Sequence, residues 1–115
     1  MHDLEDIKLR IRKFAEERDW DQFHSPKNLS MALSVEVSEL VECFQWLTEK
    51  ESAALSDEKL RAVSDEIADI QVYLVRLADK VGVDIGDAVE QKMSKNEKKY
   101  PAELVNGSAK KYSAY

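Results

Sequence analysis

Residues 33–47 read LSVEVSELVECFQWL and residues 60–77 read LRAVSDEIADIQVYLVRL, and these two stretches decide the fold. In both, large apolar side chains recur every three or four residues, which is the spacing of one face of an α-helix. The first apolar stripe extends from Leu29 to Leu47 and the second from Leu60 to Val81. The pattern predicts two long amphipathic helices.

Capping signals set the ends of these helices. Ser25-Pro26 forms an N-cap and N1 pair, so the first long helix should begin there and run to about Leu47. Ser56 precedes two acids and starts the second, and Gly82 is a suitable residue just past its end. The connector between Thr48 and Ser56 has room for a helical turn.

Two further helices flank this pair. Apolar residues at helical spacing over residues 4–18 predict the first helix of the chain. Asp84 starts the last one, which reaches about Tyr100 and stops before Pro101. Residues from about 102 to 115 should form a less regular tail. Residues 1–115 together should make one all-α domain, a four-helix bundle.

The composition agrees with a helical fold and bounds the function. Of 115 residues only three are Gly and two are Pro, whereas 35% are charged. Because a chain of this length buries a marginal core alone, we expect oligomerisation to complete the bundle. The net charge of −6 argues against nucleic-acid binding, which needs clustered Lys and Arg.

The chain shows no sign of export or of membrane insertion. Its first residues have neither a basic region nor an apolar run, and no stretch approaches the roughly 18 apolar residues that span a bilayer. The single cysteine, Cys43, lies within a helical pattern and suits a reducing compartment. We therefore expect a cytoplasmic protein that does not bind membranes.

Two pairs of carboxylates are the candidate catalytic and metal-binding residues. At 100° per residue, Glu36 falls inside the apolar stripe of its helix and Glu39 lies one turn on, at the edge. On the next long helix, Glu66 and Asp69 are three residues apart with Tyr73 on the same side. A Glu-x-x-Glu pair is usually a solvated face, but the position of Glu36 in the stripe argues for a site.

Carboxylates that converge near a core repel one another and cost several kcal/mol to desolvate unless a cation neutralises them. All-oxygen ligands favour Mg²⁺, with Mn²⁺ as a substitute, over zinc. Bound Mg²⁺ usually keeps substrate phosphate in its shell. The pattern therefore indicates a site that handles phosphate.

Other side chains are candidates for substrate binding. The apolar face of the last helix turns polar at Lys92 and Asn96, which suit a phosphate, a sugar or a base, although fraying of the stripe explains them equally well. Trp20 and Trp46 lie at helix ends, where flat rings can sandwich a nucleobase, whereas Phe23 fits core packing better. His24 either contacts substrate or supports the loop.

These residues together resemble the MazG superfamily of all-α nucleotide pyrophosphohydrolases. Glu36-Val-Ser-Glu39 and Glu66-Ile-Ala-Asp69 match its E-x-x-E and E-x-x-D signature. Further segments are similar to the dCTP pyrophosphatase branch and cover almost the whole chain: Arg18-Asp19-Trp20, Phe23-His24, Phe44-Gln45-Trp46, Tyr73-Leu74, Lys92-Met93, Asn96, Tyr100-Pro101 and Gly107-Ser108-Ala109.

The resemblance implies roles for particular residues. It implies that the four acids bind Mg²⁺, that Trp20 and Trp46 form the base pocket, and that Tyr73, Lys92 and Asn96 lie near sugar or phosphate. It also implies a dimer or a tetramer, of which we favour the homotetramer. Some relatives have a histidine near the base where this chain has Ile11, which leaves the base preference open.

The implied function is hydrolysis of a (deoxy)nucleoside triphosphate, dCTP or a related dNTP, to the monophosphate and pyrophosphate, as nucleotide pool housecleaning. Water would attack the α-phosphorus. One alternative keeps the fold but acts on dUTP or a modified nucleotide. The other is a non-catalytic, acidic helical interaction module. A di-iron bundle is excluded because it needs Glu-x-x-His motifs that His2 and His24 do not supply.

Overall fold

The computed structural model describes residues 3–107, and the regular structure within them is entirely helical. The chain divides into two compact units, Met1–Val83 and Asp84–Tyr115. The all-α prediction is thus confirmed. The elements in chain order are α1 (Leu4–Glu17), the 3₁₀ turn η1 (Asp21–Phe23), α2 (Pro26–Glu42), α3 (Glu49–Ser52), α4 (Asp57–Val81), α5 (Ile85–Lys99) and α6 (Ala102–Val105).

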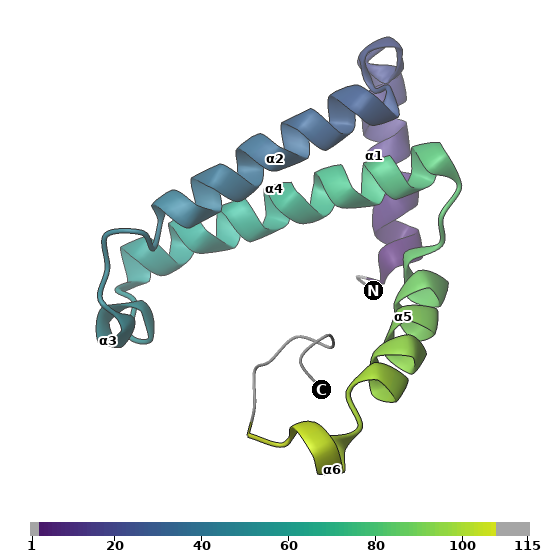
Figure 1. Cartoon of the computed structure of the whole chain (residues 1–115). Coiled ribbons are helices and arrows are strands. Elements are labelled where there is room, and N and C mark those ends of the chain that lie inside the picture. The colour runs from purple at the N-terminus through teal and green to yellow at the C-terminus, as the bar shows by residue number, and fades with distance from the viewer. Residues whose placement is uncertain (1–2, 108–115) are drawn as a thin grey trace. The chain divides into compact units, whose positions relative to one another are not determined.

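In the first unit, α2 and α4 run side by side along most of their length, and α1 packs against α4 near its C-terminal end (Figure 1). The helix starts are confirmed by their caps. The Ser25 hydroxyl accepts from the backbone N–H of Asn28 at 3.1 Å, and the Ser56 hydroxyl accepts from that of Lys59 at 3.3 Å. Both caps satisfy amides that no helical carbonyl reaches.

The predicted end of the first long helix, at about Leu47, is wrong, because α2 ends at Glu42. The backbone amides of Cys43 and Phe44 bond to carbonyls only three residues back, at 3.1 and 3.0 Å, so the helix tightens into turns. Thr48 then opens α3 with a capping box, in which its hydroxyl and the Glu51 carboxylate each accept from the other residue's amide. The Thr48 cap therefore starts a new helix, and α2 does not continue through this segment.

Two helix ends use the same backbone motif. After α4, Gly82 adopts a left-handed conformation with φ of 74°, and the Val83 amide reaches back to the carbonyl of Ala78 at 2.9 Å. After α1, Asp19 takes the same place with φ of 53°, and the Trp20 amide bonds the carbonyl of Ala15 at 2.9 Å. At the end of α1, the left-handed Asp19 turns the chain toward Trp20.

The first unit leaves much of its apolar surface uncovered. On α4, Val63 is 6% exposed, whereas Leu60 and Ile67 are 54% and 55% exposed. Besides Val72, the large apolar residues that stay exposed on α4 recur every seven positions: Leu60, Ile67, Leu74 and Val81. The face of α4 that meets α2 is therefore covered and a neighbouring strip is not.

The second unit contains α5, which Asp84 caps by accepting from the Asp87 amide at 2.9 Å, as predicted. After Pro101 the short helix α6 lies in the segment expected to be irregular, and residues 108–115 of that segment fall outside the described ones. Among residues 3–107, none of the helices combines the length and the apolarity required to cross a bilayer.

Candidate active site

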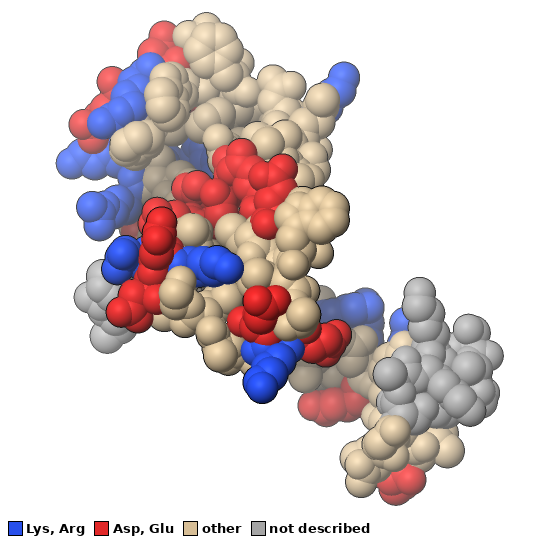
Figure 2. All heavy atoms as spheres, turned by 90° about the vertical axis from the view of Figure 1, so that its left-hand side faces the viewer, with Lys and Arg blue, Asp and Glu red and all other residues tan. Residues whose placement is uncertain are grey.

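The centre of the candidate site is formed by carboxylates on the facing helices α2 and α4. Glu36, Glu39 and Glu66 each present an oxygen, and these oxygens lie within 4.8 Å of one another. The spacing of three residues places Glu36 and Glu39 on one side of α2, and the packing of α2 on α4 brings Glu66 to them. Acidic side chains gather on the face of the first unit seen in Figure 2.

Asp69 lies three residues after Glu66 on α4, and its negative charge adds to burial, the main cause, in raising the pKa of both Glu36 and Glu66. We call Glu36, Glu39, Glu66 and Asp69 the carboxylate cluster. The structure thus brings together three of the four acids that the sequence singled out, and it places the fourth, Asp69, one turn from Glu66 on α4.

The carboxylate cluster is electrostatically unfavourable as it stands. Burial, followed by the neighbouring Glu66 and Glu39, raises the pKa of Glu36 to about 7. Burial also raises the pKa of Glu66. In the described part of the chain, the buried Oε2 atoms of Glu36 and Glu66 have no hydrogen-bond partner. Buried polar atoms are normally satisfied, so these two oxygens are suited to coordinate a bound ligand.

A divalent cation fits this set of residues. The ligands are all carboxylate oxygens, which hard cations such as Mg²⁺ and Mn²⁺ prefer. Their combined negative charge would be neutralised, and the orphaned oxygens would be coordinated. No histidine or cysteine belongs to the group of oxygens within 4.8 Å, which makes zinc a poor match.

Trp20 and His24 flank the 3₁₀ turn η1 in the loop between α1 and α2. The Trp20 ring makes edge contacts with Phe14, at a centroid distance of 5.6 Å, and with His24, at 6.4 Å. It remains 44% exposed, so one part of the ring is open to a ligand. Its setting suits the base-binding role, which stays a prediction.

His24 is held by a residue that the sequence did not single out. Its Nδ1 accepts a hydrogen bond from Nε of Arg76 at 3.2 Å. Burial, then the charges of Arg76 and Lys80, lower the pKa of His24. The imidazole is therefore neutral near pH 7, with a structural partner on one nitrogen. Arg76 itself, on α4, is only 3% exposed.

The remaining predicted residues lie on separate elements. Tyr73 is half-buried on α4, one turn beyond Asp69. Trp46 lies in the turns after α2 and is 86% exposed. Lys92 is exposed and Asn96 half-buried, one turn apart on α5 in the second unit. Their contacts with substrate stay predictions.

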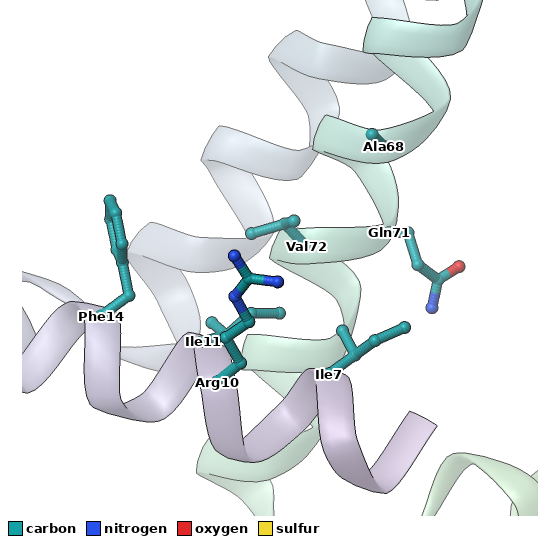
Figure 3. A pocket seen from close by; sticks show the side chains of 7 residues that line it. All are labelled: Ile7, Arg10, Ile11, Phe14, Ala68, Gln71 and Val72. Atoms are coloured by element: carbon teal, nitrogen blue, oxygen red, sulfur yellow. The ribbon is translucent and has the colours of Figure 1, made fainter. Parts of the chain in front are cut away.

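A pocket of about 450 Å³ lies between α1 and α4 (Figure 3). Ile11 and Phe14 contribute from α1, and Ala68 and Val72 contribute from α4. At 100° per residue, Ala68 points to the side of α4 opposite Glu66. The pocket is therefore a separate apolar hollow and not part of the carboxylate cluster.

Comparisons with known proteins show which family the chain resembles. The MazG-like family model matches residues 31–114. The chain is 47% identical over 112 residues to dCTP pyrophosphatase 1 of Bos taurus and 46% identical over 112 residues to that of Homo sapiens, with 96% of this chain covered in each case. The chain spans 66% of the length of these curated relatives.

A solved structure gives the same picture of the fold. A pyrophosphatase from Archaeoglobus fulgidus superposes with a TM-score of 0.82 at 39% sequence identity. The match covers 88% of this chain and 94% of that one. The helical arrangement that carries the carboxylate cluster is therefore shared with a solved structure described as a pyrophosphatase.

Proposed function

The chain belongs to the MazG-like family, and from that premise we propose that it hydrolyses a (deoxy)nucleoside triphosphate to the monophosphate and pyrophosphate, with the help of a divalent cation. The observation that carries this proposal is the carboxylate cluster with its two orphaned, buried oxygens. The relatives named dCTP pyrophosphatase favour dCTP or a related dNTP as substrate, in nucleotide pool housecleaning.

The residues of the chain divide the work in this proposal. Glu36, Glu39, Glu66 and Asp69 hold Mg²⁺, which supplies a Lewis acid that neutralises phosphate charge. A carboxylate of the cluster accepts the proton of the water that attacks the α-phosphorus, and pyrophosphate leaves. Trp20 and Trp46 stack on the base, while His24, Tyr73, Lys92 and Asn96 bind the remaining parts of the nucleotide.

The decisive assay is to incubate the purified protein with Mg²⁺ and each common dNTP and NTP, resolving monophosphate and pyrophosphate by chromatography. We expect both products, most from dCTP, and none with EDTA. The same products from dUTP or a modified nucleotide would keep the reaction and change the base pocket. No turnover of any triphosphate would contradict the proposal and favour a non-catalytic interaction module.

We also propose that the protein is a homo-oligomer, a tetramer rather than a dimer. The support is the strip Leu60, Ile67, Leu74 and Val81 on α4, whose seven-residue spacing is that of a helix-packing seam. Val37 and Val41 on α2 are likewise exposed, at 43% and 52%. Light scattering coupled to gel filtration tests this, and the mass of a monomer would contradict it.

The two units should work together as one domain, residues 1–115. The family match runs from residue 31 to 114 and therefore crosses from the first unit into the second. A fragment ending at Val83 keeps the carboxylate cluster but loses Lys92 and Asn96, so we expect it to bind Mg²⁺ and fail to turn over substrate. Full activity of that fragment would refute the prediction.

We also propose that the protein is cytoplasmic, because nucleoside triphosphates are made and used in the cytoplasm. Cell fractionation tests this location.

A further inference from the structure

A set of charged side chains away from the carboxylate cluster joins three segments of the first unit. Arg76 on α4 donates from Nη2 to Asp21 Oδ1 at 2.5 Å and from Nε to His24 Nδ1 at 3.2 Å. It also donates from Nη1 to Asp79 Oδ2 at 3.5 Å. One buried guanidinium thus ties the loop between α1 and α2 to α4.

Asp79 and Lys80 extend these contacts. Asp79 accepts two hydrogen bonds from Arg12 of α1, from Nη2 at 2.6 Å and from Nε at 3.0 Å. Lys80 donates to Asp21 Oδ1 at 2.5 Å. We call Arg12, Asp21, His24, Arg76, Asp79 and Lys80 the Arg76 network. It locks α1, the loop and the end of α4 to one another.

The loop held by the Arg76 network carries two of the proposed substrate-binding residues. Trp20 comes directly before Asp21, and its ring contacts His24. On its other side the chain is fixed by Asp19, whose carboxylate and carbonyl both accept from Nε2 of Gln22 at 3.0 Å. The orientation of Trp20 is thus set by α1 before the ring and by the Arg76 network after it.

The Arg76 network lies on the same side of α4 as the carboxylate cluster. Asp69, Tyr73 and Arg76 are spaced four and three residues apart, which aligns them along one side of a helix. At about 1.5 Å per residue, Arg76 lies roughly 10 Å along the axis from Asp69. A nucleotide with its phosphates on the cluster and its base extended along α4 in this direction would reach the loop.

We propose that Arg76 is a positioning residue, which holds the loop so that Trp20 and His24 meet the base or sugar of the substrate. This inference rests on the function proposed above. The contact also fixes the tautomer, since Nδ1 of His24 accepts from Arg76 and the proton of the neutral ring must sit on Nε2. His24 then presents an N–H donor toward a ligand.

Arginine is required for this role, and lysine does not replace it. The planar guanidinium directs separate N–H groups at Asp21, His24 and Asp79 at once, whereas an ammonium is a point charge on a flexible stem. Arg76→Lys keeps the positive charge but loses the simultaneous contacts. It therefore separates the geometry of Arg76 from its charge.

The kinetic test compares Arg76→Lys and Asp21→Asn with the control Arg61→Met, an exposed arginine on the same helix. Hydrogen bonds to charged groups contribute about 1.5–3 kcal/mol, so we expect KM for the preferred dNTP to rise roughly 10- to 100-fold in Arg76→Lys. Because the carboxylate cluster is untouched, kcat should stay within about threefold, as expected for lost substrate binding. Arg61→Met should change neither.

A second readout does not depend on turnover. In a Trp46→Phe background, Trp20 is the sole tryptophan, and acrylamide quenching of its fluorescence reports how firmly the ring is held. We expect stronger quenching in Arg76→Lys and Asp21→Asn than in Arg61→Met. If no protein hydrolyses any triphosphate but the quenching changes as expected, the proposed function fails while the anchoring of the loop by Arg76 stands.

Circular dichroism first establishes that each variant is folded. Should Arg76→Lys not fold, Asp21→Asn carries the test, because the Asp21 side chain is 55% exposed and the buried Arg76 guanidinium keeps Asp79 as a charged partner. A folded Arg76→Lys or Asp21→Asn variant with an unchanged KM and unchanged quenching would overturn the proposal. A fall in kcat with no change in KM would also overturn the proposal.

Discussion

The carboxylate cluster and the Arg76 network both use charged side chains of α4. They differ in whether each charge has a partner of opposite sign. In the carboxylate cluster like charges face one another, and two buried oxygens have no partner in the described part of the chain. In the Arg76 network each carboxylate meets a cation, and the buried guanidinium has three acceptors. The first arrangement needs a ligand, whereas the second is complete and serves the fold.

The largest effect should come from removing a carboxylate of the cluster. Glu39→Ala or Asp69→Ala should abolish measurable pyrophosphate release, because metal-assisted charge stabilisation contributes several kcal/mol and its loss is on the order of 1000-fold or more. Helicity by circular dichroism should be unchanged. Glu58→Gln, an exposed acid on the first turn of α4, is the control. Retained activity in Glu39→Ala would refute the assignment.

Breaking the satisfied network should instead affect stability. Arg76→Met removes the donor that Asp21, His24 and Asp79 share. Because Asp79 keeps Arg12 and Asp21 keeps Lys80, the expected loss is that of unsatisfied hydrogen-bond partners, about 1–3 kcal/mol. We expect the urea midpoint to fall accordingly. Glu36→Gln serves as the comparison, since it relieves repulsion and should not destabilise the metal-free protein. Equal stability losses in both variants would remove the distinction drawn here.

The two sets of charges should also respond to pH in opposite directions. Folding raises the pKa of Glu36 from 4.5 to about 7, mainly through burial, so the folded state binds more protons in that interval. The free energy of unfolding in EDTA should then fall as pH rises from 4.5 to 7. A fall on the order of 1 kcal/mol is expected, since water screens the half-exposed group.

Asp79 behaves in the reverse way, because the hydrogen bond from Arg12 lowers its pKa below the usual 3.8. Its contribution is present above that value and is lost as pH falls below it. Urea denaturation across the pH range measures both effects. Glu36→Gln should reduce the dependence between pH 4.5 and 7, leaving the part that comes from Glu66, and should leave the acidic loss intact. A profile unaltered by Glu36→Gln would contradict the role given to burial.

The smallest effect should come from the exposed edge of the Arg76 network. Lys80 pairs with Asp21, whose side chain is 55% exposed, and solvent-exposed ion pairs contribute little. We expect Lys80→Met to shift Tm by less than about 2 °C, as measured by thermal denaturation. A shift as large as that of Arg76→Met would show that the whole network, and not its buried arginine, stabilises the fold.

Features set by neighbouring residues were predictable from the sequence. The caps at Ser25, Ser56 and Asp84 and the left-handed Gly82 depend on local hydrogen bonds, so the helix starts and the end of α4 were correct. The carboxylate cluster was also foreseeable, because a glutamate within an apolar stripe is out of place on a solvated face. Its position in the pattern carried the information.

Features that depend on distant contacts were not predictable. Arg12 pairs with Asp79 across 67 positions of the chain, and Arg76 with Asp21 across 55, and no spacing rule connects such residues. No sequence pattern therefore singled out Arg76. The end of α2 was missed for a different reason, since the apolar stripe continued to Leu47 while the turns before the Thr48 cap had already replaced the helix.

Asp19 holds the left-handed conformation at the end of α1 that Gly82 holds at the end of α4. Side chains disfavour this conformation and glycine does not. An Asp codon becomes a Gly codon by a single base change, so the relaxed alternative is always within mutational reach. Selection for heat resistance alone should recover Asp19→Gly early. Selection for turnover should keep Asp19, because its carboxylate accepts a hydrogen bond from Gln22 in the loop that carries Trp20.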